Sequence, residues 1–239
     1  PGCGKTTVAQ YISHTAGLPL ITARLDGLVS SLLGSTAKNI RRIFDYASRS
    51  ECILFLDEFD VVAKVRDDHH ELGELKRVVN SLLQNIDDLS PSSILIAATN
   101  HHDLLDPAVW RRFNKIIILD EPSKDEIKLL LKRFLQPVDS NLMTHNGKMD
   151  KVADAFEGMS HADIETIVNN SIKKAIINKR NVVDGWELLG EAYLYSNHRI
   201  VSDSDFIEYL LEHGVVQREI NTGFGYSLRK IREVSAKIE

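Results

Sequence analysis

The sequence predicts an α/β protein: a parallel-sheet core, followed by a small all-helical lid and a short helical tail. Over the first half of the chain, short apolar runs alternate with segments of helical period, which is typical of a parallel sheet with helices on both faces. After the Asp120-Glu121-Pro122-Ser123 hinge the strand pattern stops, and only helical segments follow. The boundaries we expect are 1–121 for the core, 122–198 for the lid and 199–239 for the tail.

The elements of the core are expected in a simple order. A helix over 6–16 ends at the stop signals Gly17 and Pro19, and a short strand over 18–22 follows. The continuous apolar run at 52–56 suits a strand buried on both faces. Apolar spacing predicts helices over 36–46 and 72–86, and two more buried strands over 94–98 and 115–119. The strand that should precede the opening loop is expected to lie outside the printed sequence.

The second half of the chain shows only helical patterns. Ser123 is a suitable N-cap for a helix that includes Phe134. Further helices are expected near 149–156, 160–179 and 184–195, and two or three short ones over 202–239.

Composition and charge exclude several classes of protein. With 43% apolar and 26% charged residues, the chain is globular and not disordered. A net charge of −5 excludes binding to nucleic acid or anionic lipid by bulk charge alone. Two cysteines exclude a disulfide framework and favour a reducing, cytoplasmic location. No apolar run approaches the roughly 20 residues of a membrane helix, so no membrane segment is predicted in this sequence.

The chain opens inside a phosphate-binding motif. Gly4-Lys5-Thr6 is the second half of G-x-x-x-x-G-K-[ST], whose first glycine would lie upstream of Pro1. We therefore interpret the sequence as a fragment. In such a loop the backbone N–H groups cradle phosphates, the lysine reaches the β- and γ-phosphates, and the Thr6 hydroxyl binds Mg²⁺. The other predicted nucleotide-binding residues of the loop are Gly2, Cys3 and Thr7.

Polar residues follow two of the predicted strands. Asp57 and Glu58 directly follow the buried run at 52–56. Because unpaired buried charge is energetically costly, two adjacent carboxylates at this position indicate a function. We predict that Asp57 lies on the Mg²⁺ side and that Glu58 activates or orients the attacking water. Asn100, after the next strand, can reach the γ-phosphate or that water.

The next motif along the chain is Leu105-Asp106-Pro107-Ala108-Val109-Trp110-Arg111-Arg112-Phe113. Together with the motifs before it, this segment makes the chain resemble the AAA family of P-loop ATPases from Pro1 to about Tyr195. The resemblance implies a P-loop NTPase core with ATP and Mg²⁺ bound. It places Lys5 and Thr6 in Walker A, Asp57 and Glu58 in Walker B, and Asn100 at sensor 1. Arg111 and Arg112 are similar to arginine fingers that enter the neighbouring subunit's site. The resemblance therefore implies a homo-oligomer, which we expect to be a hexamer. A monomer should have almost no ATPase activity.

The lid carries a second resemblance. Gly158-Met159-Ser160-His161-Ala162-Asp163-Ile164 is similar to the Gly-x-Ser-Gly-Ala-Asp segment of the FtsH, spastin and katanin branch. His161 and Ala162 would then lie beside the adenine. His161 departs from the usual glycine, and it either stacks on the base or crowds the turn.

Two functions follow as alternatives. The first is an oligomeric motor that remodels a polypeptide or protein complex. Leu32 and Leu33 favour it, because they occupy the place of the family's central-pore loop, although without its aromatic ring. The second is an ATP-gated DNA-binding regulator. It is favoured by residues 207–232, which are similar to bacterial helix-turn-helix segments and end in a helix with the basic residues Arg229 and Lys230.

Overall fold

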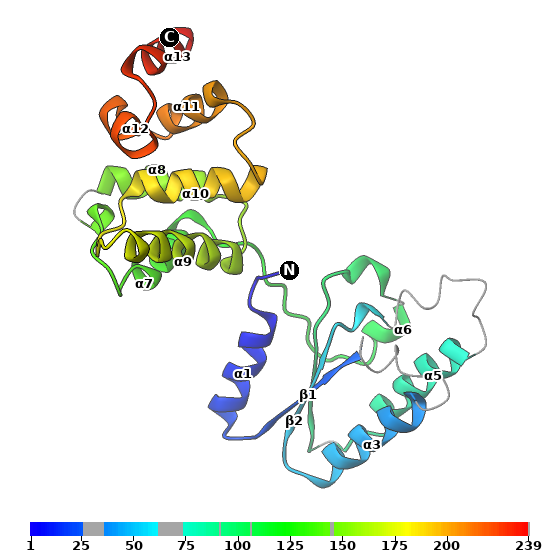
Figure 1. Cartoon of the computed structure of the whole chain (residues 1–239). Coiled ribbons are helices and arrows are strands. Elements are labelled where there is room, and N and C mark those ends of the chain that lie inside the picture. Colours follow the sequence, from blue (N-terminus) through cyan, green and yellow to red (C-terminus); the bar gives the residue numbers. More distant parts are fainter. Residues whose placement is uncertain (26–35, 62–73, 91, 106, 144–145, 239) are drawn as a thin grey trace. The chain divides into compact units, whose positions relative to one another are not determined.

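The computed structural model describes residues 1–25, 36–61, 74–90, 92–105, 107–143 and 146–238 (Figure 1). Internal contacts divide the chain into two units. The first holds Pro1 and residues 3–119, and the second holds Gly2 and residues 120–239.

The first unit is built on a parallel sheet with the strand order β1-β2-β3. Its strands are β1 (Leu20–Arg24), β2 (Ile53–Asp57) and β3 (Ile94–Ala97). Its helices are α1 (Lys5–Ala16), α3 (Thr36–Arg49), α5 (Glu74–Asp87) and α6 (Pro107–Trp110), with a 3-10 turn η2 (His102–Leu104). The parallel α/β fold class predicted from the sequence is confirmed.

The central strand β2 supplies the core of this unit to both sides. Leu54 and Leu56 are at most 1% exposed and pack into one cluster with residues of α3 and α5. Phe55, which points to the opposite face, packs against Ala9 of α1. Helix α1 therefore covers one face of the sheet while α3 and α5 cover the other (Figure 1). Each such side chain contributes about 1.5–3 kcal/mol by its burial.

The expected strand over 115–119 is wrong. This segment has no regular secondary structure, and Ile116, Ile117 and Ile118 are 57%, 58% and 78% exposed. A strand forms only where a neighbour completes its backbone hydrogen bonds, and in the described part of the chain no strand pairs with this segment. The strand expected over 94–98 does form as β3. Its first residue, Ile94, is 39% exposed because β3 lies at one end of the described sheet.

The second unit is helical. It consists of α7 (Lys124–Phe134), α8 (Asn146–Ala155), α9 (His161–Ile177), α10 (Gly185–Asn197), α11 (Asp203–Glu212), α12 (Gln217–Phe224) and α13 (Leu228–Ile238), with a 3-10 turn η3 (Asn141–Met143). One hydrophobic cluster runs through the helices of the expected lid and tail alike. Ser123 caps α7 as predicted: its backbone N–H donates to the Glu126 carboxylate at 2.8 Å. Among the described residues, no helix is long and apolar enough to cross a membrane.

Candidate active site

The opening loop presents unpaired backbone donors. Gly2 and Gly4 have φ values of +76° and +86°, a left-handed conformation that glycine adopts without strain. Gly4 is the N-cap of α1 and has no side chain to bond the first N–H groups of the helix. The first turn also contains no acidic residue. An anion at this helix start would therefore find N–H donors and a favourable helix dipole.

Side chains from two elements meet beside this loop. Lys5 Nζ, at the start of α1, donates a hydrogen bond to Asn100 Oδ1, three residues beyond β3. The loop's Thr6 and Thr7 are exposed, and Cys3 is partly buried. The structure thus brings together two site residues that are 95 positions apart in the sequence.

The acidic pair lies at the end of β2. Asp57 is its last residue, and one carboxylate oxygen accepts a hydrogen bond from the Glu58 N–H at 3.0 Å. Glu58 has a φ of +56°, which is uncommon outside glycine and frequently marks a functional residue. Its carboxylate lies 3.6 Å from Nη2 of Arg24, the last residue of β1. Sequence reasoning missed Arg24, because only the parallel register places it opposite Asp57.

A buried carboxylate supports the loop that carries Asn100. Asp60 is 6% exposed and accepts a hydrogen bond from the Thr99 hydroxyl at 3.4 Å. The same hydroxyl accepts a hydrogen bond from the His101 N–H at 3.0 Å. These contacts hold the backbone on both sides of Asn100. Asp60 and Thr99 were not predicted to take part in the site.

The two arginines have different surroundings. Arg112 is held by Asp87 at the end of α5: Nε lies 2.8 Å from Oδ1 and Nη2 lies 2.7 Å from Oδ2. Its third nitrogen donates to the Ala108 carbonyl at 2.7 Å. Arg111 is exposed and makes no ion pair or side-chain hydrogen bond with any described residue. Behind the pair, Phe113 packs edge-on against Phe59, with the ring centroids 5.9 Å apart.

The predicted base-contacting residues lie at the start of α9 in the second unit. Ser160 caps this helix by accepting a hydrogen bond from the Asp163 N–H at 3.3 Å. His161 Nδ1 is buried and has no hydrogen-bond partner among the described residues, whereas Ala162 is exposed. Burial by itself would raise the pKa of Asp163, but hydrogen bonds from Tyr195 and Ser160 outweigh it and lower that pKa.

The tail folds as helices, and two of its basic residues have acidic partners. Lys230 binds Asp203, and Arg229 lies 2.9 Å from Glu233. Gly223 lies against Trp186 of α10 so closely that an added Cβ would be 2.5 Å from the indole ring. These contacts give the helix-turn-helix prediction no support, and it stays a prediction.

Some predicted residues cannot be placed. Leu32 and Leu33 of the expected pore loop lie outside the described residues, as does Asp106 of the segment before the arginines.

Comparison with known proteins matches residues 1–121 to the family model "ATPase family associated with various cellular activities (AAA)". A protein from Sinorhizobium fredii, "Uncharacterized AAA family ATPase y4kL", is 45% identical over 183 residues, which are 77% of this chain and 54% of that protein. "Peroxisomal ATPase PEX1" of Saccharomyces cerevisiae is 31% identical over 92% of this chain and 21% of its own length.

A third relative is the "ATP-dependent zinc metalloprotease FtsH" of Thermobaculum terrenum, 31% identical over 77% of this chain and 29% of its own length. The chain thus spans about half or less of the length of each of these three relatives. Among solved structures, the FIGL-1 AAA domain in complex with ADP superimposes with a TM-score of 0.69 at 19% identity, over 88% of this chain and 74% of that one. At that identity the likeness establishes the fold.

Proposed function

Because the chain belongs to the AAA family of ATPases, we propose that it binds and hydrolyses ATP as one subunit of a homo-oligomeric, hexameric motor. The observation that carries the proposal is the convergence of Lys5 and Asn100, with Asp57 and Glu58 at the end of the parallel strand β2. Because the parallel strands β2 and β3 end at the same edge of the sheet, Asn100 follows β3 at the edge where Asp57 ends β2, and the hydrogen bond from Lys5 to Asn100 joins the phosphate loop to that edge.

The opening loop fits the phosphates of ATP. The uncapped N–H groups at the start of α1 bind their oxygens, and Gly2, Cys3 and Gly4 supply loop backbone. Lys5 exchanges its contact with Asn100 for the β- and γ-phosphates. The Thr6 hydroxyl and the Asp57 carboxylate are hard oxygen donors of the kind that Mg²⁺ prefers, and Thr7 continues the loop. Bound Mg²⁺ would neutralise charge that develops on the phosphates.

Glu58 is the residue we assign to the attacking water. Its carboxylate accepts the water's proton while the water oxygen attacks the γ-phosphorus and ADP leaves. Asn100 orients the water or the γ-phosphate. Arg24 and the attacking water both interact with the Glu58 carboxylate in this proposal. The ion pair with Arg24 therefore determines the direction in which that carboxylate points.

Arg111 is the finger that completes a neighbouring subunit's site, and Arg112 is a positioning residue. Arg111 is exposed, whereas Asp87 and Ala108 fix all three nitrogens of Arg112 within its own subunit. A finger of this kind accelerates hydrolysis by about 10³–10⁵-fold.

His161 and Ala162 contact the nucleobase in this proposal. The buried, unpartnered Nδ1 of His161 favours a hydrogen bond to the base over simple crowding of the turn. As the substrate we propose a polypeptide or protein complex, because the name of the FtsH relative describes a protease that depends on ATP. The predicted pore residues Leu32 and Leu33 would contact it.

The decisive experiment mixes two inactive variants of the full chain. Glu58→Gln keeps its finger but cannot hydrolyse ATP, and Arg111→Ala keeps its hydrolytic residues but lacks the finger. Each alone should lose at least about 10³-fold in ATPase rate. Mixed, the Arg111→Ala subunits receive the finger of Glu58→Gln neighbours, so the rate should recover well above either variant.

The exposed Arg199, changed to Ala in the second unit, is the matched control and should behave as the wild type. The wild-type rate per subunit should also rise steeply with protein concentration. No recovery on mixing, together with a rate independent of concentration, would show that sites are not shared between subunits.

A further inference from the structure

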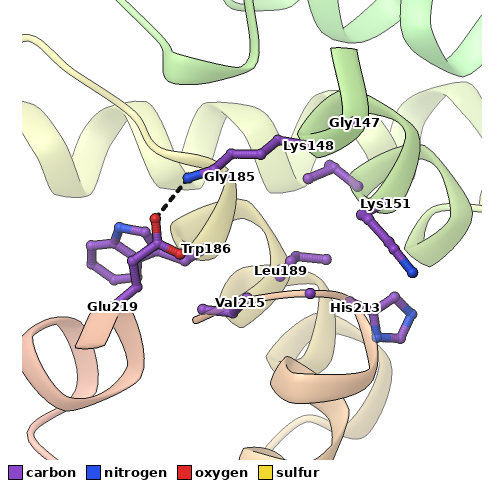
Figure 2. Close-up of a pocket in the computed structure, with 11 residues that line it drawn as sticks. Gly147, Lys148, Lys151, Gly185, Trp186, Leu189, His213, Val215 and Glu219 are labelled. Atoms are coloured by element: carbon purple, nitrogen blue, oxygen red, sulfur yellow. Dashed lines mark hydrogen bonds and ion pairs between the residues drawn. The ribbon is translucent and has the colours of Figure 1, made fainter. Parts of the chain in front are cut away.

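A cavity of about 480 Å³ lies within the second unit, separate from the residues of the candidate active site. It is lined by α8, by the first turns of α10, by the loop that joins α11 to α12, and by Glu219 of α12, and it is open to solvent (Figure 2). Its volume falls in the range of about 300–1,000 Å³ that is usual for small-molecule sites.

One wall of the cavity is apolar and rigid. Val152, Leu189 and Val215 are 1%, 2% and 5% exposed, and Trp186 completes this wall. The indole ring packs edge-on against Phe224, with the ring centroids 5.2 Å apart, and it would lose this contact if it moved into the space. The cavity therefore offers a preformed surface to an apolar group.

At one end the charges neutralise each other. Lys148 Nζ lies 2.7 Å from the Glu219 carboxylate, and Figure 2 shows the two side chains reaching toward each other beside Trp186. Glu219 also accepts a hydrogen bond from the Val216 N–H at 3.3 Å. This ion pair joins α8 to α12, so its two charges are already paired within the chain.

The other end carries one cationic group, Lys151, without an acidic partner among the described residues. Lys151 runs its stem along Gly214, where an added Cβ would lie 3.5 Å from Cγ, and its ammonium group has no ion pair with a described residue. His213 also lines this end of the cavity, and its Nδ1 donates to the Tyr209 carbonyl at 2.8 Å. In the view of Figure 2, Lys151 and His213 lie on the right, and the ion pair of Lys148 with Glu219 lies on the left. In the described lining, Lys151 is thus the charged side chain without an ion-pair partner, and it favours a negative charge.

We propose that this cavity binds a carboxylate carried on a compact apolar body, either a free acid or the C-terminus of a peptide. The carboxylate is bound by the Lys151 ammonium group, and the apolar body lies against Trp186, Leu189 and Val215. Charge-assisted hydrogen bonds fix the orientation, and burial of the body supplies most of the affinity.

The test uses 4-phenylbutyrate as the probe and its neutral amide as the comparison ligand, with binding measured by calorimetry on the full chain. The chain has two tryptophans, so a Trp110→Phe background makes Trp186 emission a local reporter of the same cavity. The acid should bind saturably and about tenfold or more tightly than the amide.

Lys151→Met keeps the aliphatic stem and removes the charge. It should weaken binding of the acid about tenfold without changing the melting temperature of the protein. Lys173→Met, at an exposed position on α9, is the matched control and should leave binding unchanged. A short peptide ending in Leu, with a free or an amidated C-terminus, separates the two sources: binding of either free acid supports the proposal, and the tighter one identifies the source. Equal binding of acid and amide, an unchanged affinity in Lys151→Met, or no saturable binding of any acid would overturn it.

Discussion

The ion pair between Arg112 and Asp87 should stabilise the first unit without being needed for hydrolysis, unlike the adjacent Arg111. Its bidentate geometry, with distances of 2.8 and 2.7 Å, is the stronger form of this interaction, and the Ala108 carbonyl accepts a third bond. Solvent reduces the gain, because the Arg112 side chain is 26% exposed and that of Asp87 is 50% exposed. We therefore expect a coupling free energy of about 1 kcal/mol, near the upper end for partly exposed pairs.

A double-mutant cycle measures this coupling. Arg112→Ala, Asp87→Ala and the double variant are unfolded with urea, and Trp110 emission reports on the first unit in a Trp186→Phe background. Each single variant should lose about 1–2 kcal/mol, and the double variant should lose about 1 kcal/mol less than the sum.

The neighbouring arginine serves as the kinetic comparison. Arg111→Ala should leave the unfolding free energy unchanged and lose about 10³-fold or more in ATPase rate, while Arg112→Ala should lose far less. The opposite pattern, with Arg112→Ala as inactive as Arg111→Ala and no coupling to Asp87, would refute our assignment of the two roles.

Two further predictions concern the second unit. Gly190→Ala on α10 should destabilise it by about 1–2 kcal/mol, because the new Cβ would lie 2.6 Å from the Phe224 ring. The same change at Gly147, where an added Cβ would meet open space, should stabilise the unit slightly. Thermal unfolding should therefore show a lower melting temperature for Gly190→Ala and a slightly higher one for Gly147→Ala. Burial raises the pKa of Tyr209 to about 12, and burial with a hydrogen bond to Asp203 does the same for Tyr226. Because both values lie above the unfolded pKa near 10, these phenols contribute stability below pH 10 that is lost as the pH rises through 12. Phenolate absorbance should therefore show these two phenols ionising near pH 12, and ionisation near 10 in the still-folded chain would contradict this.

The sequence predicted the elements of the first unit where the signal is local. Apolar runs located β2 and β3, and periodicity with stop signals located α1, α3 and α5. The run at 115–119 has as many apolar residues as β2 but forms no strand in the structure. An apolar run indicates that a segment can form a strand if a neighbouring strand pairs with it. It does not indicate which neighbour supplies the backbone hydrogen bonds. Strand order and register are absent from the sequence pattern for the same reason.

The site was predictable only as far as its linear motifs extend. Lys5, Asp57, Glu58 and Asn100 each follow or begin a recognisable element, so their positions could be read from the chain. Arg24 could not be identified in this way, because its contact with Glu58 arises from the pairing of β1 with β2. Asp87 could not be identified either, because its bond to Arg112 depends on how α5 packs.

The tail shows why a helical pattern alone does not decide between surface recognition and packing. Residues 217–238 form the two helices that the sequence predicted, with a turn at Gly225. A face with the period of a helix looks the same in sequence whether it binds DNA or covers another helix. What separates the two is the partner: Gly223 makes room for Trp186, and Phe224 packs edge-on against Phe206 with ring centroids 4.9 Å apart. A glycine inside a helix costs about 1 kcal/mol relative to alanine, and at Gly223, in the last turn of α12, that cost is offset by a contact that any larger side chain would prevent. The observed packing therefore accounts for a glycine at this position, and it favours a tail that covers the α10 helix.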